Sequence, residues 1–180
     1  MTAQKQIRVE DLVDTPELDR LLRFINSKTP HRFTGICRVV GKDLKVFHLV
    51  DKFLQPINRT MHEMPLRVSF ALHVLRDGEF FCDDCSTEKR LLGNPFRDLI
   101  GSYVGVSLEK ELGLSGCVIC HYDIRKFETN GTQICFLKEI LPLLSLALTP
   151  APSEENPQLA FPDLGRVAFD ESEASGSSGV

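Results

Sequence analysis

Two pairs of cysteines have the spacing of a metal knuckle, Cys82-x-x-Cys85 and Cys117-x-x-Cys120. Four thiolates with this spacing could hold a zinc ion in tetrahedral geometry. A knuckle needs a tight turn, whereas Cys117 to Cys120 lies in a run typical of a β-strand, where residues three apart point to opposite faces. The strand pattern therefore favours buried small thiols, and a zinc site through these four residues is kept as the alternative.

The first cysteine pair is the better redox candidate, because it lies where a short predicted strand runs into a loop. Asp83 and Asp84 separate the two cysteines, and neighbouring carboxylates raise the pKa of a thiol instead of lowering it. In a chain without an export signal, we also expect all six cysteines to be reduced thiols. We therefore predict no catalytic residue, and keep a thiol-based redox enzyme as the alternative to a binding protein.

Charge and composition narrow the classes of partner. The 180 residues are 42% hydrophobic and 26% charged, which suits one globular domain. Of the net charge of −4, residues 149–180 carry −5, and the rest of the chain is nearly neutral with 20 basic and 19 acidic residues. We expect neither nucleic acid nor an anionic membrane as partner, because both are bound largely by clustered Lys and Arg.

The hydropathy pattern bears on location. No apolar run is long enough to span a bilayer, and the segment from Met1 to Glu10 lacks the apolar stretch of a secretion signal. We therefore expect a cytoplasmic protein. His31, Arg32 and Arg38 form a small basic cluster, which we interpret as a solvated edge of the first strand or a partner for the acidic tail, because no glycine-rich phosphate cradle accompanies it.

The elements that must position these side chains follow from periodicity, capping residues and turn residues. The patterns predict helices at 15–27, 65–77 and 132–148, a short helix near 96–100, and strands at 33–40, 44–51, 79–82, 102–108 and 115–123. Residues 1–13 are a polar N-terminal segment and 14–148 form the domain. Residues 149–180 are an acidic tail that we expect to be disordered, because it cannot bury enough apolar area to offset its ordering entropy.

The last two predicted strands carry a specific pattern. The run SYVGVSL at 102–108, Gly113 and the run GCVICHYD at 116–123 resemble the closing hairpin of the GAF family. Weaker likeness extends to residues 33–38 and 69–84, so the resemblance covers about 14–148. It implies an α+β, GAF-like (profilin-like) fold, with a central antiparallel sheet of about six strands and helices on both faces.

The resemblance also implies a small-molecule pocket on one face of that sheet. It places six polar or aromatic side chains around the pocket: Ser69, His73, Asp84, Arg97, Tyr103 and His121. For each, a cap, surface or core role is the competing interpretation. The Cys120-His121 pair is similar to the pair that anchors bilin in phytochrome-type members, but it lies in a strand here, so we expect no covalent bilin.

We therefore predict a small-molecule-binding regulatory GAF domain in signal transduction, with its ligand and any cofactor unidentified. Leucine-rich faces at 14–25 and 132–148 predict a homodimer, and a protein partner would carry the signal onward. One alternative is a redox enzyme similar to the free methionine sulfoxide reductases of this family, and another is a zinc protein. A third is a pocketless fold kept for dimerisation, which closed apolar packing around Ser69, His73 and Tyr103 would favour.

Overall fold

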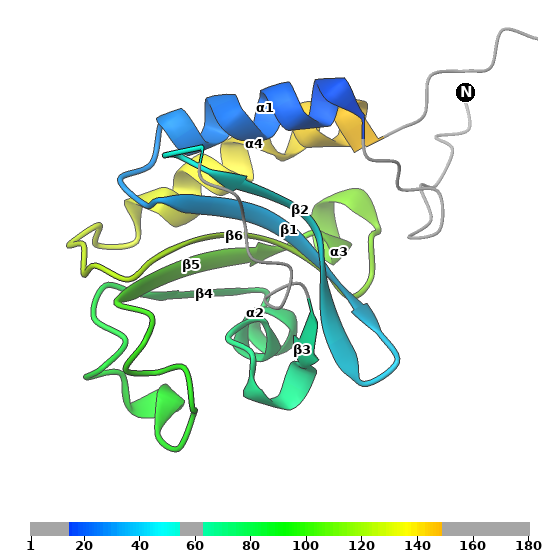
Figure 1. The fold of residues 1–180 in the computed structure, drawn as a ribbon. Helices are drawn as coiled ribbons and strands as arrows, with labels where there is room; N and C mark the ends of the chain where they lie inside the picture. The colour runs from blue at the N-terminus through cyan, green and yellow to red at the C-terminus, as the bar shows by residue number, and fades with distance from the viewer. Residues whose placement is uncertain (1–14, 55–62, 149–180) are drawn as a thin grey trace, which may run out of the picture.

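A computed structural model describes residues 15–54 and 63–148 of the chain. They form one six-stranded antiparallel sheet with helices on both faces (Figure 1), which confirms the predicted α+β class. The strands are β1 (Phe33–Val40), β2 (Asp43–Asp51), β3 (Glu63–Pro65), β4 (Glu79–Cys82), β5 (Ser102–Ser107) and β6 (Cys117–Asp123), in the spatial order β3-β2-β1-β6-β5-β4. The helices are α1 (Pro16–Ser27), α2 (Ala71–Asp77), α3 (Glu109–Leu112) and α4 (Thr132–Leu148), with 3-10 turns η3 (Leu66–Val68) and η4 (Lys89–Leu91).

Helices α1 and α4 lie side by side over one face of the sheet (Figure 1). Thr15 caps α1 by accepting a hydrogen bond from the Leu18 amide at 3.2 Å, and Pro16 occupies the first turn, where its missing N–H costs nothing. Apolar side chains of both helices, among them Leu22 and Leu144, pack on Ile36 and other strand residues in one buried cluster. Both helices have the bounds that the sequence predicts, to within one residue.

The opposite face is covered by the shorter α2, which packs on β4 and β5. The sequence pattern predicts that this helix begins at Pro65, but the structure has a 3-10 turn there and α2 begins at Ala71. Ser69 between them is extended, at φ −86° and ψ 151°, so a single helix cannot run through it. Gly105 permits the close approach of α2, because a Cβ atom there would lie 2.8 Å from Cγ2 of Val74.

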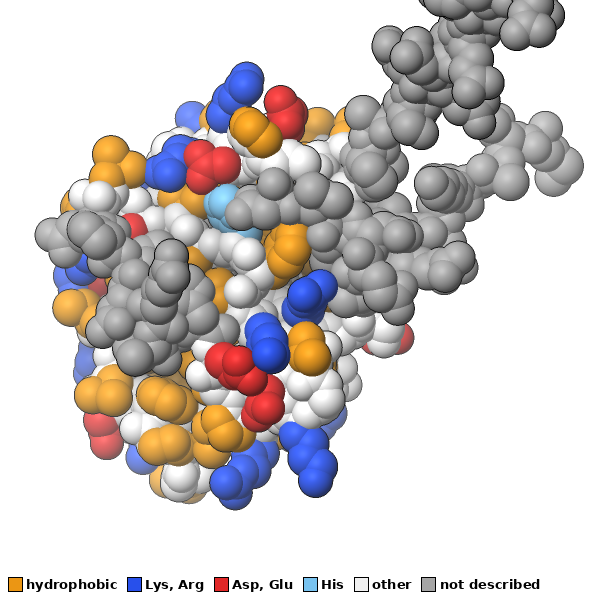
Figure 2. Space-filling model, turned by 45° about the vertical axis from the view of Figure 1, so that its right-hand side comes forward, with side chains coloured by type: hydrophobic (Ala, Val, Ile, Leu, Met, Phe, Trp, Pro, Cys, Tyr) orange, Lys and Arg blue, Asp and Glu red, His pale blue; other side chains and the backbone are white. Residues whose placement is uncertain are grey.

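The predicted helix near 96–100 is wrong, because the structure has turns there and the segment 86–101 contains only η4 as a helical element. Asn94 holds the start of this segment: its side-chain oxygen accepts from the Phe96 amide at 2.9 Å and its side-chain nitrogen donates to the Val68 carbonyl at 2.9 Å. The first of these bonds is also made by helix N-caps, but only one turn closes after it, through the Ile100 amide and the Phe96 carbonyl at 3.0 Å. The loop exposes Leu92 and Leu99, and Figure 2 shows hydrophobic side chains gathered at the lower end of the face it draws.

Three predictions fall on parts of the chain that the structure does not describe. They are the polar segment at 1–13, the disordered acidic tail at 149–180 and the first residue of the predicted dimer face, Asp14. Within 15–54 and 63–148, none of the helices is both long and apolar enough to cross a membrane.

Candidate functional site

Five of the six cysteines are buried, and they are divided between the two faces of the sheet. Cys37, Cys82, Cys85 and Cys120 belong to the cluster under α2. Cys117 belongs to the cluster under α1 and α4, because three residues along β6 it faces away from Cys120. The four cysteines of the zinc alternative are therefore not brought together, and the described residues contain no group of three His, Cys, Asp or Glu that could hold a metal ion.

The thiols under α2 are paired with one another. The Cys37 thiol donates a hydrogen bond to Cys120, and this bond, together with one from the Tyr103 hydroxyl, lowers the pKa of Cys120 against the opposing effect of burial. A hydrogen bond to Cys85 and burial raise the pKa of Cys82 far above its usual range. Cys120 is therefore the thiol whose ionised form this face stabilises, although its side chain is almost fully buried.

Three of the predicted pocket residues pack together under or beside α2. The Ser69 hydroxyl donates to the Leu66 carbonyl at 2.9 Å, and Tyr103 packs edge-on against Phe70 with ring centroids 5.4 Å apart. His73 stacks on Phe80 at 5.0 Å, and burial lowers its pKa. Ser69 and Tyr103 are buried, as the pocketless alternative anticipates, whereas His73 is half-buried and its Nδ1 has no hydrogen-bond partner among the described residues.

Asp84 and Arg97 lie in the loop between β4 and β5, and both have internal partners. Asp84 accepts hydrogen bonds from the Ser86 hydroxyl and from the Lys126 ammonium at 2.8 Å, and these bonds lower its pKa. The Arg97 Nε donates to the Cys85 carbonyl at 3.3 Å. These contacts fasten the loop to its neighbours, as the cap interpretation of Asp84 expects.

The structure separates His121 from the other predicted pocket residues. In β6 it follows Cys120, so it faces α1 and α4, and its Nδ1 lies 2.8 Å from the Thr34 hydroxyl on that side. His31 is also fully buried there, with its ring centroid 5.9 Å from that of His121. The interpretation of His31 as part of a solvated basic edge is therefore wrong.

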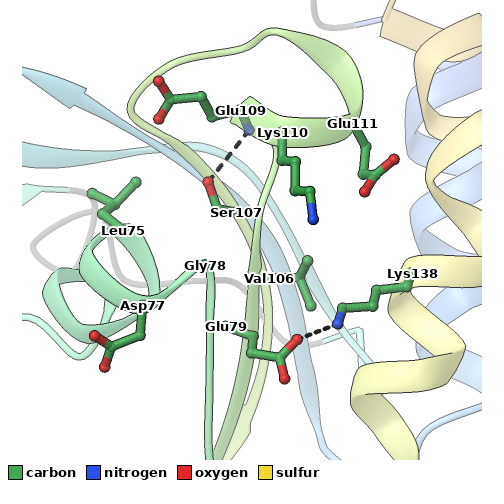
Figure 3. A pocket seen from close by; sticks show the side chains of 10 residues that line it. All are labelled: Leu75, Asp77, Gly78, Glu79, Val106, Ser107, Glu109, Lys110, Glu111 and Lys138. Carbon is green, nitrogen blue, oxygen red and sulfur yellow. Dashed lines mark hydrogen bonds and ion pairs between the residues drawn. The ribbon is translucent and has the colours of Figure 1, made fainter.

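A cavity of about 350 Å³ opens at the end of the sheet where α2, α3 and α4 meet. None of the predicted site residues lines it; its walls are Leu75, Asp77, Gly78, Glu79, Val106, Ser107, Glu109, Lys110, Glu111 and Lys138 (Figure 3). Lys110 points from α3 toward Val106 and Lys138, and Lys138 forms an ion pair with Glu79. The Ser107 hydroxyl accepts a hydrogen bond from the Glu109 amide at 3.3 Å.

No family model matches this chain, and no curated protein matches it. Solved structures do. A type II free methionine-R-sulfoxide reductase from Thermoplasma acidophilum has a TM-score of 0.56 and 16% identity, covering 73% of this chain and 89% of that one. The GAF domain of a two-component sensor histidine kinase from Bacillus halodurans has a TM-score of 0.52 and 11% identity, covering 73% of this chain and 90% of that one. The phycocyanobilin-bound GAF domain of a cyanobacterial phytochrome has a TM-score of 0.54 and 8% identity, covering 74% of this chain and 84% of that one.

This chain has a GAF-like fold. The resemblance inferred from residues 102–123 is thereby confirmed at the level of the fold. At these identities the likeness carries no activity, and both a sensor and a reductase share the GAF-like architecture. The function has to be argued from the sites.

One part of the GAF-like domain that sequence analysis missed is a half-buried aromatic cluster where β1 begins. Phe33 stacks on Tyr122 with centroids 4.9 Å apart, and the Arg32 guanidinium lies 4.7 Å from the Phe33 centroid and 5.2 Å from that of Phe53. Arg32 also pairs with both carboxylate oxygens of Asp51, at 2.8 and 2.7 Å. The cluster depends on strand register, because Phe33 and Tyr122 are far apart in sequence and meet only across β1 and β6.

Proposed function

We propose that this chain is a regulatory GAF-type domain that binds a small molecule in the cavity between α2, α3 and α4 and transmits its occupancy through α4. The observation that carries this proposal is the position of the cavity, which is lined from both helical layers and includes Lys138 of α4. A ligand at this place would contact a terminal helix directly. The six residues predicted from the family resemblance do not line this cavity, and each of them contacts other residues of the domain.

The lining suggests the chemical class of the ligand. The volume of the cavity lies at the lower end of the range of small-molecule sites, and Leu75 and Val106 supply apolar surface. Four carboxylates line the cavity against two ammonium groups, and one of those, Lys138, is already paired with Glu79. The balance favours a small ligand that carries an ammonium or guanidinium group, held by charge-assisted hydrogen bonds to Glu109 and Glu111.

Calorimetric titration with putrescine and L-arginine tests the site. We expect at least one of these probes to bind, and the variant E109Q/E111Q to bind it about 100-fold more weakly, since two charge-assisted bonds of about 1.5 kcal/mol each are lost. Glu128→Gln is the matched control, because Glu128 is exposed and lies outside the lining. Binding that is absent at millimolar probe, or equal in the double variant and the control, would contradict the proposal.

We propose a homodimer through α1 and α4 as the means of transmission. These helices expose apolar side chains outward, with Phe24 52%, Leu143 51% and Leu146 75% exposed. Light scattering at a series of concentrations should give twice the mass of one chain, and Leu146→Lys should shift the equilibrium toward the monomer. Leu92→Lys is the control, because Leu92 is similarly exposed but belongs to the loop between β4 and β5. A monomer at all concentrations would remove this part of the proposal.

A thiol-based reductase is the second candidate, and one observation favours it: Cys120 accepts hydrogen bonds from both Cys37 and Tyr103. Thiol titration of the native protein distinguishes the two functions. A binding domain should show one rapidly reacting thiol, at the exposed Cys135, because the other five are buried. A second fast thiol that Cys120→Ser removes, together with dithiothreitol-dependent reduction of free methionine-R-sulfoxide, would favour the enzyme.

A further inference from the structure

Two buried imidazoles meet where α1 joins the sheet. His31 lies between α1 and β1, His121 lies in β6, and neither side chain has any exposed surface. Their rings are nearly parallel, at 16°, with centroids 5.9 Å apart. Each Nδ1 lies 2.8 Å from a threonine hydroxyl, Thr29 for His31 and Thr34 for His121. Each Nε2 is buried and has no hydrogen-bond partner within the part of the chain that the structure describes.

Both threonine hydroxyls have a second hydrogen-bond partner. The Thr34 hydroxyl accepts from the Asn26 amide at 2.8 Å and keeps its own proton and a second lone pair, so it can either donate to His121 Nδ1 or accept from it. The Thr29 hydroxyl likewise accepts from the His31 backbone amide at 3.3 Å and can bond His31 Nδ1 in either direction. A neutral ring fits these contacts in either tautomer, whereas an imidazolium must carry a proton on both nitrogens, including the buried Nε2 that has no partner among the described residues.

The same chain of bonds fastens the end of α1. The side-chain nitrogen of Asn26 donates to the Arg32 carbonyl at 3.1 Å and to the Thr34 hydroxyl, which in turn is hydrogen-bonded to His121 Nδ1. Asn26, Thr34 and His121 thus link α1 to β1 and β6. The link is built around a neutral His121, because this ring has no exposed surface.

We propose that the His31–His121 pair is a proton-operated joint between α1 and the sheet. A proton taken from solvent by either ring makes donors of both its nitrogens, and the buried Nε2–H has no acceptor within the part of the chain that the structure describes. A charged imidazolium is then left beside a second imidazole, without exposed surface. Opening of the α1 end admits water to the charge, so protonation and release of α1 are linked.

Charged groups from three segments face the pair. Burial lowers the pKa of His31 to about 4, opposed by the carboxylates of Asp123 and Asp83 and reinforced by the Lys52 ammonium. Burial lowers the pKa of His121 to about 3, and His31 and Lys52 act in the same direction. The two carboxylates therefore reduce the downward shift of the His31 pKa but do not reverse it.

The direction of the pH dependence follows from these values. In the unfolded or opened state a histidine has a pKa of about 6.5, so that state binds more protons than the closed state below this pH. Stability is therefore complete above about pH 6.5 and is lost as the pH falls toward 4. Between pH 7 and pH 5 each histidine lowers the closing equilibrium constant about 20-fold.

Long-range nitrogen–proton NMR of the imidazoles, with hydrogen exchange of the backbone at pH 7 and pH 5, tests the joint in the full chain. We expect both buried rings to be neutral at pH 7 and to stay neutral at pH 5. Exchange at the end of α1 should accelerate at pH 5 beyond its intrinsic change, while β5 keeps its protection. A charged ring at pH 7, titration near pH 6.5, or equal loss of protection in α1 and β5 would overturn the proposal.

The variant His121→Asn sharpens the test, because its side-chain oxygen can accept from Thr34 but cannot titrate. We expect it to remove about one 20-fold step from the pH dependence of the closing constant, whereas the control Thr34→Ser, which keeps the hydroxyl, should retain that step. If His121→Asn does not fold, His31→Asn is used in the same way against Thr29→Ser. An unchanged pH dependence in the asparagine variant would overturn the proposal, and if neither variant folds, the wild-type measurement decides.

Discussion

The two faces of the sheet are built from different side chains. The face under α1 and α4 is packed with leucine and isoleucine, and two buried histidines, two buried threonines and Asn26 meet at one end of it. The face under α2 is packed with cysteines and aromatic rings, which bond or stack with one another. The side chains that look most chemical in the sequence are therefore spread over both faces, and most have internal partners.

Residue type alone does not locate a site in this fold. Thiols, a phenol and an imidazole under α2 serve packing, whereas the cavity is lined by ordinary surface charges at the ends of three helices. The helices that cover the two faces also differ in length, because α2 has 7 residues whereas α1 and α4 have 12 and 17. The face under α2 should therefore depend more strongly on single large side chains.

The largest effect is expected for Phe80→Ala on the face under α2. Phe80 is 1% exposed, stacks on His73, packs near Tyr103 and supports the Arg90 guanidinium 4.4 Å from its ring centroid. Removing the ring leaves a large cavity beneath a short helix, so we expect a loss of about 4 kcal/mol in the free energy of unfolding. Urea titration measures it, and a loss below about 2 kcal/mol would show that α2 collapses into the space.

A smaller effect is expected for Leu144→Ala on the opposite face. Leu144 is fully buried in α4, but it is one of many aliphatic side chains that two long helices contribute to the same cluster. We expect a loss of about 3 kcal/mol by the same titration. The comparison of the two faces fails if this variant loses clearly more stability than Phe80→Ala.

Local patterns predicted most elements because their signals lie within a few residues. The cap at Thr15 and the leucines at helical spacing define α1, and the strands of both hairpins have the predicted positions. The patterns missed β3 and α3, which have three and four residues and are too short for a periodic signal. They also predicted helix where Ser69 is extended before α2 and where residues 96–100 form turns. The bond from Asn94 to the Val68 carbonyl, which holds that loop, joins residues that only the packing brings together.

The site was less predictable because it depends on register and on tertiary contacts. Alternation along β6 separates Cys117 from Cys120, and the same rule applied to His121 would have placed it opposite Cys120. The pairing of Tyr103 with Tyr122, which fixes what each face presents, is a property of the folded sheet. The cavity could not be predicted at all, since its lining comes from the ends of elements that meet only after folding.

Two adjacent residues of β6, Ile119 and Cys120, face opposite sides of the sheet. Ile119→Val removes one methylene from the face under α1 and α4 and should cost about 1 kcal/mol. Cys120→Ala should cost about 2 kcal/mol, because the buried Tyr103 hydroxyl loses its acceptor.

The double variant Cys120→Ala with Tyr103→Phe separates packing from hydrogen bonding in that last cost. Removing both partners leaves only the weak Cys37 S–H donor without its acceptor, in the single and in the double variant alike, so the double variant should be about 1 kcal/mol more stable than Cys120→Ala with respect to unfolding in urea. Additive losses from the two substitutions would mean that the thiol contributes by its volume alone. The face under α2 would then be held together in the same way as the face under α1 and α4, and the contrast between them would reduce to the length of the covering helices.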